Sequence, residues 1–155
     1  MKKHYSLLYY TVLLITEDKQ MTDFMKLHRP GIGNAASYQV SGIPWVSSSL
    51  AVPASGSTVL EISFPQVSKS IIVKNVSTGS GLRLMRVGFS ENGVKNSSNF
   101  FLLSAGESFA ADLKVTKVYL MSNDGTALTA SVTAGLTNIP ATELVNNWSG
   151  SAGVG

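Results

Sequence analysis

The 155-residue sequence contains no cysteine and only two histidines, His4 and His28. Without cysteine there can be no disulfide framework, no thiolate nucleophile and no cysteine-ligated zinc site. Both histidines precede the segment that is predicted to fold. A Ser-His-Asp triad or a histidine metal site would therefore have to recruit them from the first 28 residues. We expect no enzyme activity, and no cofactor or metal in residues 36–155.

Charge is also scarce, because charged residues make up 14% of the chain, against roughly 25% in an average soluble domain. The first 34 residues hold five of the 12 Lys and Arg and three of the nine Asp and Glu. The remainder is therefore nearly neutral, and its lysines and arginines are scattered singly from Lys69 onward. A nucleic-acid binder normally has a basic stripe or cluster. The sequence therefore predicts no specific nucleic-acid partner, and a surface rich in Ser, Thr, Asn and Gly.

The N-terminal residues form an apolar segment that resembles a signal peptide, with Lys2 and Lys3 before an apolar run from Tyr5 to Ile15. The run lacks a small-residue cleavage site, and it is shorter than the roughly 20 apolar residues that span a bilayer. Residues 16–28 have the spacing of a short amphipathic helix. We interpret residues 1–35 as an arm, whose apolar side chains should lie against the body, a neighbouring molecule or a membrane surface.

From Ala36 onward, apolar and polar residues alternate, which places successive side chains on opposite faces of a sheet. In TVLEISF, for example, Leu60, Ile62 and Phe64 share one face. Eight such runs, separated by short turns rich in Gly, Ser, Asn and Asp, are predicted to be strands. They cover residues 45–52, 58–64, 70–76, 82–89, 99–104, 107–115, 117–122 and 126–137.

Eight strands without a convincing internal helix predict an all-β fold, namely an eight-stranded antiparallel jelly-roll β-sandwich with an extended or helical N-terminal arm. An immunoglobulin-like sandwich is the alternative. The domain is placed at residues 36–140. It is followed by a C-terminal tail at 141–155, in which ATELVNNW forms a helical turn and SGSAGVG is flexible unless a partner orders it. The predicted core contains Leu60, Ile62, Phe64, Ile71, Val73, Phe109, Leu113, Leu128, Val132 and Leu136.

Ser68 and Lys69 are adjacent, as in a Ser–Lys catalytic pair. Such a pair needs a desolvated lysine with a depressed pKa and an oxyanion hole. Lys69 instead opens a predicted strand on which Lys74 faces solvent, so we interpret the pair as a polar start to that strand. Arg83 and Arg86 fall on opposite faces of another strand. One is expected to face solvent and the other to pair with a carboxylate, or alternatively to form an intersubunit salt bridge.

Two further groups of residues are candidates for binding or modification sites. Trp45, Tyr38 and Trp148 could stack on a sugar, although a tryptophan at the start of a strand more often covers a core edge or an interface. Three Asn-X-Ser sequons begin at Asn75, Asn96 and Asn147. With nine asparagines and abundant Ser, about two sequons are expected by chance, so they carry little information. Asn96 lies in a predicted loop.

Four segments, in their order along the chain, carry a family resemblance. They are FPQVSKSIIVKN, LRLMRVGFSENGV, NFFLLSAGESFAADLKVTKVYLMSN and AGLTNIP. The set, which covers roughly Ser41 to Pro140, resembles the single jelly-roll minor capsid and penton proteins of nucleocytoplasmic large DNA viruses, especially the chlorella-virus-like group. The arm at residues 1–34 has no counterpart in this pattern.

The resemblance implies a structural protein of an icosahedral viral capsid, either the penton at the five-fold vertex or a minor capsid protein that cements the major capsomers. It implies a virion location and assembly in the host cytoplasm. The partners that it implies are copies of the same chain, as a pentamer, and other capsid proteins including the major capsid protein, with proximity to the inner membrane. It carries no catalytic motif. The arm residues expected to contact neighbouring subunits or the inner, membrane-facing side of the shell are Leu7, Leu8, Tyr10, Val12, Leu14 and Phe24. The alternative function is a carbohydrate- or receptor-binding β-sandwich module, and an enzyme is the weakest third possibility.

Overall fold

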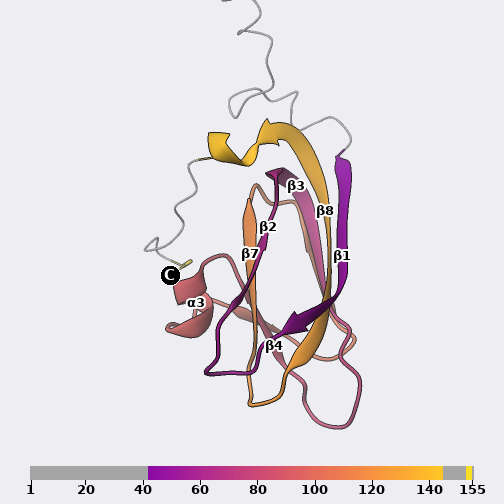
Figure 1. Ribbon diagram of the computed structural model, residues 1–155, viewed down its shortest axis with the longest axis vertical. Coiled ribbons are helices and arrows are strands. Elements are labelled where there is room, and N and C mark those ends of the chain that lie inside the picture. The colour runs from indigo at the N-terminus through magenta and orange to yellow at the C-terminus, as the bar shows by residue number, and fades with distance from the viewer. Residues whose placement is uncertain (1–41, 145–152, 155) are drawn as a thin grey trace, which may run out of the picture. The chain divides into compact units, whose positions relative to one another are not determined.

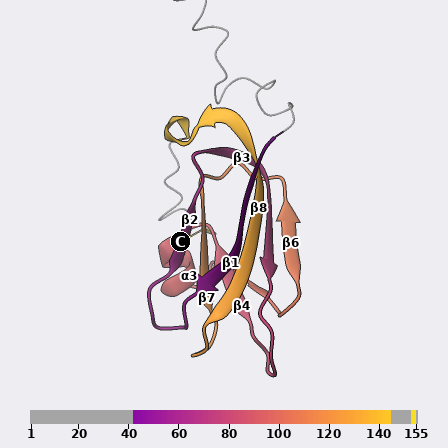
Figure 2. The same cartoon turned by 45° about the vertical axis from the view of Figure 1, so that its right-hand side comes forward.

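The computed structural model of the chain describes residues 42–144 and 153–154. Two antiparallel four-stranded sheets lie face to face (Figures 1 and 2). The strands are β1 (Ile43–Val52), β2 (Leu60–Ser63), β3 (Gln66–Asn75), β4 (Met85–Gly88), β5 (Phe101–Leu103), β6 (Ser108–Ala111), β7 (Lys117–Ser122) and β8 (Leu128–Pro140). Two short helices accompany them, α3 (Glu91–Lys95) and the 3-10 helix η1 (Ala141–Glu143). The structure confirms an all-β sandwich, and η1 is the helical turn expected after Pro140.

The strand order follows a nested pattern. One sheet has the order β1-β8-β3-β6 and the other β2-β7-β4-β5. The first strand pairs with the eighth, the second with the seventh, the third with the sixth and the fourth with the fifth. Pairing of β3 with β8 joins β1-β8 to β3-β6 in one sheet, and pairing of β4 with β7 joins β2-β7 to β4-β5 in the other. Every connection except the one between β4 and β5 therefore passes from one sheet to the other.

The core lies between the two sheets and has the predicted register. Of the ten residues predicted for the core, seven are buried, and Leu60, Phe109 and Leu113 pack half-exposed against the same cluster. A slip of one residue in any strand would have moved its apolar set to the outer face. The alternation in the sequence therefore identified the inward faces correctly.

Two strand boundaries differ from the prediction because the chain changes sheets there. The sixth strand was expected to continue to residue 115, but β6 ends at Ala111 and the chain then crosses toward β7. The third strand begins at Gln66, earlier than expected. Ser68 and Lys69 therefore lie inside β3, where the pairing with β8 is irregular, and the interpretation of these residues as the start of a strand was wrong.

A helix also stands where the sequence was interpreted as a turn. In SENGVKNSS, Ser90 has an extended backbone, and its Oγ accepts a hydrogen bond from the backbone N of Gly93 at 2.9 Å, which caps α3. Glu91 in the first turn and Lys95 in the last turn complement the helix dipole. The helix contacts β4 and β7 and lies on the side of the sandwich away from β1 and β8 (Figures 1 and 2). Neither helix among the described residues has the length and apolarity needed to cross a membrane.

Candidate functional site

The outer face of the β1-β8-β3-β6 sheet carries a row with two exposed, branched apolar residues, Val46 and Ile72, that point away from the core. Val46 pairs with Thr133 of β8, and Thr133 pairs in turn with Ile72 of β3. Ile72 also pairs with Ala110 of β6, so the row crosses all four strands. Val46 is 64% exposed and Ile72 is 45% exposed. Since neighbouring strands lie about 4.8 Å apart, these two branched side chains stand roughly 10 Å from each other.

The other outward-facing residues of this sheet have mostly small side chains, and almost none of them is charged. Across the paired rows of the sheet, the outward residues other than Val46 and Ile72 are Pro44, Ala51, Ser70, Lys74, Ser108, Ala110, Thr129, Ser131, Thr133 and Gly135. In that described set Lys74 carries the single charge. A surface of this composition can approach another protein without desolvating many charged groups. We call it the β1-β8-β3-β6 outer face.

The outer face of the other sheet is different, because it is charged and partly covered. Glu61 Oε1 accepts from Lys117 Nζ at 2.7 Å and from Ser63 Oγ at 2.8 Å. Hydrogen bonds from Lys117 and Ser63 lower the pKa of Glu61, whereas burial and the neighbouring Glu61 carboxylate raise the pKa of Tyr119 to about 12. The helix α3 occupies another part of this face, through its contacts with β4 and β7. The two faces of the sandwich therefore offer unlike surfaces.

Ser68 is buried with no exposed surface, and both capacities of its hydroxyl are used. Its Oγ donates to the backbone O of Leu113 at 2.6 Å and accepts from the backbone N of Val115 at 3.0 Å. These bonds hold the crossing segment between β6 and β7 against β3. The hydroxyl is a structural clamp, as the contacts of Ser68 show, and it has no open space around it for a substrate.

Within residues 42–144 and 153–154, neither Arg83 nor Arg86 has the carboxylate partner that was predicted for one of them. Arg86 Nε donates to Asn123 Oδ1 at 2.8 Å, its guanidinium reaches the backbone O of Val94 at 3.3 Å, and its Cζ lies 4.6 Å from the centroid of the Phe100 ring. Arg83 precedes β4 and is half-buried, and its Nε has no hydrogen-bond partner in the part of the chain that the structure describes. Arg86 instead fastens α3 to β4 and to the turn after β7.

The three sequons fall in unlike environments. Asn75 is fully buried, and its Nδ2 donates to the backbone O of Arg83 at 2.8 Å and of Leu103 at 3.0 Å. A glycan cannot reach that nitrogen without unfolding the β3 end. Asn96 is exposed at the C-terminal end of α3, whereas Asn147 lies outside the described residues.

Of the three aromatic residues that are candidates for stacking on a sugar, the structure describes Trp45. Trp45 is half-buried and packs edge-on against Phe64, with ring centroids 4.9 Å apart and planes at 84°. It covers the core edge, as the commoner interpretation of such a residue predicted. Tyr38 and Trp148 lie outside the described residues.

The predicted arm contacts lie outside the described residues as well. This holds for Leu7, Leu8, Tyr10, Val12, Leu14 and Phe24. Within the described part of the chain, no group of three or more His, Asp and Glu side chains is placed to hold a metal ion. Sequence reasoning did not single out Val46 and Ile72, although each is a branched apolar residue on the solvent face of an alternating strand, which was the available signal.

The described residues define an all-β protein, a sandwich of two antiparallel four-stranded sheets with almost no helix. No family model and no curated protein matches the chain. Among solved structures it is similar to one from a study of Bacillus endospore appendages that "form a novel family of disulfide-linked pili". The identity is 15% and the TM-score 0.36, over 63% of this chain and 91% of that one. A likeness at that score carries no argument about function.

Proposed function

We propose that the chain is an eight-stranded jelly roll that serves as a structural subunit of an icosahedral viral capsid. The observation that carries this proposal is the nested pairing of the first strand with the eighth, the second with the seventh, the third with the sixth and the fourth with the fifth. This is the pairing of one long antiparallel hairpin, with β4-β5 at its tip, rolled into two sheets. Such a roll of eight strands is the architecture of viral jelly-roll capsid domains.

The same pairing favours a jelly roll over an immunoglobulin-like sandwich. In an immunoglobulin fold several consecutive strands pair as hairpins within one sheet. Here β4 and β5 are the single consecutive pair among the described strands. The segments that carry the resemblance to minor capsid and penton proteins also coincide with β3, with β4 and α3, with β5 to β7, and with the end of β8.

The β1-β8-β3-β6 outer face supplies the contact that a shell subunit needs. Val46 and Ile72 are exposed on it and Lys74 is its one charge among the described paired rows. Burying one such apolar side chain against a neighbour is worth roughly 1.5–3 kcal/mol, and no cluster of charges opposes the approach. In this proposal the chain assembles with copies of itself as a pentamer and with other capsid proteins, in the host cytoplasm, as the penton or as a minor protein cementing major capsomers.

The full chain is the material for the test, with sedimentation velocity and negative-stain electron microscopy as readouts. We expect concentration-dependent assembly into closed five-fold rings. The double variant Val46→Lys/Ile72→Lys should weaken assembly at least about tenfold in concentration, because two apolar contacts are lost. Leu102→Lys is the matched control, since Leu102 is also 45% exposed but lies on the other sheet.

Two results would count against these statements separately. A wild-type chain that stays monomeric at all concentrations, and does not join rings or capsomers when mixed with the other shell proteins, overturns the shell function. A wild-type chain that assembles, with a double variant that assembles equally well, leaves the function standing and shows that the contact lies elsewhere.

A further inference from the structure

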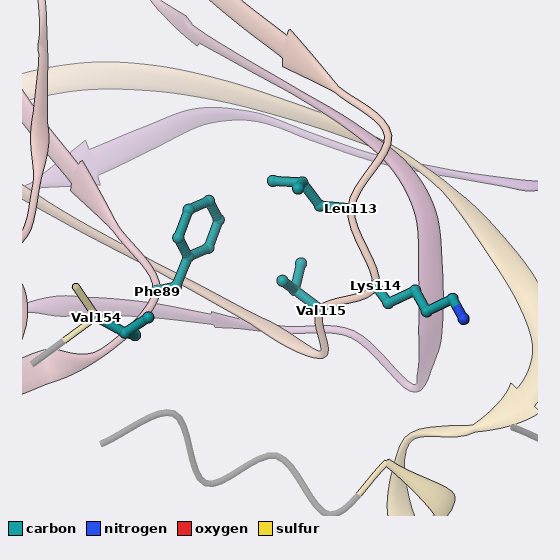
Figure 3. A pocket seen from close by; sticks show the side chains of 5 residues that line it. All are labelled: Phe89, Leu113, Lys114, Val115 and Val154. Carbon is teal, nitrogen blue, oxygen red and sulfur yellow. The ribbon is translucent and has the colours of Figure 1, made fainter. Parts of the chain in front are cut away.

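An apolar cavity of about 300 Å³ lies between the end of β4 and the segment that crosses from β6 to β7. Its lining residues are Phe89, Leu113, Lys114, Val115 and Val154. Figure 3 shows Phe89, Leu113 and Val115 directed toward a common space, with Val154 beside Phe89, whereas the amino end of Lys114 points away. The cavity is therefore apolar in character, and it is lined by three parts of the chain that lie far apart in the sequence, at residues 89, 113–115 and 154.

Val154 is fixed at this cavity by its backbone as well as by its side chain. Its carbonyl O accepts a hydrogen bond from Ser90 Oγ at 2.6 Å, and the same Oγ accepts from the backbone N of Gly93 at 2.9 Å. Ser90 is 3% exposed. The hydrogen bond from the backbone N of Gly93 orients its hydroxyl, which can then donate to the Val154 carbonyl. The polar anchor and the apolar cavity thus lie next to each other. Val154 belongs to both, because Ser90 binds its carbonyl and its side chain forms part of the cavity wall.

Two glycines make the contact selective. A Cβ on Gly93 would lie 2.2 Å from the Val154 carbonyl O, so a side chain at that position would exclude the bound segment. Gly153 has a φ of +83°, a left-handed conformation that costs residues with a side chain about 1–2 kcal/mol. The bound sequence therefore needs glycine followed by an apolar residue that lines the cavity.

We propose that Ser90, Gly93, Phe89, Leu113 and Val115 form a peptide-recognition site, and that its ligand is the chain's own Gly153–Val154. The chemical class of the ligand is a turn segment with glycine before an apolar residue, held by one hydroxyl-to-carbonyl hydrogen bond and completing the wall of one apolar cavity. This is a small version of peptide recognition in which the main chain supplies affinity and a pocket supplies specificity. The inference is independent of the proposed shell function, because it concerns a contact within one chain.

The test uses the full chain and a fluorescein-labelled peptide with the sequence SGSAGVG, corresponding to residues 149–155. Val154→Asp in the protein should release the internal segment, since a carboxylate in the wall of the apolar cavity, beside Phe89 and Val115, carries a desolvation cost. We expect the peptide to bind the Val154→Asp protein at least about tenfold more tightly than the wild type, whose site is occupied. Fluorescence anisotropy measures the binding, and circular dichroism checks that both proteins are folded.

Control variants separate recognition from loss of folding. In the Val154→Asp background, Gly93→Ala should abolish peptide binding, whereas Gly125→Ala should not, since a Cβ there meets no atom within 4 Å. If Gly93→Ala fails to fold, peptides altered at the valine give the same information without changing the protein. An isoleucine peptide should bind within about threefold of the valine peptide, and an aspartate peptide at least about tenfold more weakly.

Equal binding of the peptide to wild type and Val154→Asp, or equal binding of the valine and aspartate peptides, would overturn the proposal. These measurements report on the segment and its cavity, not on particle assembly. Their failure would therefore leave the proposed shell function as it stands, and failure of assembly would leave the recognition site as it stands.

Discussion

Ser68 resembles a catalytic serine in the sequence, but in the fold its hydroxyl holds two backbone groups in place. Its hydroxyl bridges the backbone O of Leu113 and the backbone N of Val115 inside a region without solvent. Adjacent Lys69 made the pair resemble a catalytic motif, but the motif is local and the partners of the hydroxyl are 45 and 47 residues away. Only the tertiary structure brings those partners to it.

Removal of this hydroxyl should therefore destabilise the fold. Ser68→Ala leaves a backbone carbonyl and a backbone N–H without partners, and we expect a loss of about 2–4 kcal/mol in the free energy of unfolding. Urea denaturation followed by circular dichroism measures the change. Ser108→Ala is the control, because Ser108 is exposed on β6, and it should alter the free energy by less than about 0.5 kcal/mol. A Ser68→Ala protein with the same free energy of unfolding as the control would show that these two hydrogen bonds do not stabilise the fold.

Tyr119 gives a residue-scale prediction about pH. Burial and the carboxylate of Glu61 raise the pKa of Tyr119 from its ordinary value of 10.0 to about 12. The folded state therefore holds the phenolic proton more tightly than the unfolded state does. The resulting contribution to stability is complete below pH 10 and is lost as the pH rises from 10 toward 12.

Absorbance at 295 nm against pH measures this titration. The difference between the wild type and Tyr119→Phe isolates this phenol from the other tyrosines, and its midpoint should lie near pH 12. Over the same range the stability of the wild type should fall more steeply than that of Tyr119→Phe. A difference titration centred at the ordinary tyrosine value of 10.0 would show that Tyr119 is neither desolvated nor coupled to Glu61.

At the scale of elements, α3 is the feature that sequence patterning missed. Five residues make too short a segment for a helical period to show, and the Asn-Gly pair inside ENGVK is a strong turn signal. The cap was nevertheless visible in principle, since Ser90 precedes an acidic residue at the first helical position. The helix persists because Arg86 and the buried side chain of Val94 attach it to the sheet.

The attachment through Arg86 should be measurable. Arg86→Met keeps an unbranched side chain but loses the hydrogen bonds to Asn123 and Val94 and the contact with Phe100. We expect a loss of about 1–3 kcal/mol, with faster amide hydrogen exchange concentrated in α3. Lys95→Met is the matched control, because Lys95 is an exposed residue of the same helix. Unchanged exchange in α3 after Arg86→Met would show that apolar packing alone holds the helix.

At the scale of the whole molecule, the described residues of the two sheets form a continuous core between them. The main core cluster runs from Val52 to Leu136, and each of its members belongs to the strands or to their connections. The arm, in contrast, contains an apolar run from Tyr5 to Ile15. If these side chains pack on neighbouring subunits, as the shell proposal requires, the fold and the assembly should be separable.

Deletion of residues 1–34 tests that separation. We expect a folded, soluble β-sandwich whose melting temperature differs from that of the full chain by less than about 5 °C, and which no longer enters rings or particles. Thermal denaturation reads the first outcome and sedimentation velocity the second. Normal assembly of the truncated protein would remove the arm from the interface, and so would an experimental structure with the arm packed wholly against its own sandwich.

The sequence by itself determined which residues face the core, because an alternating pattern on a strand has only two possible registers and one of them buries polar groups. It also determined the all-β class and the approximate positions of eight strands. The order of those strands was decided by tertiary structure, since pairs such as β1 with β8 join residues 76 (Val52 and Leu128) to 93 (Ile43 and Leu136) positions apart, and no local pattern records such a distance. The same reason explains why Ser68, Arg86 and Val154 acquired their roles only in the folded chain: their partners lie elsewhere in the sequence and come together when the sheets close.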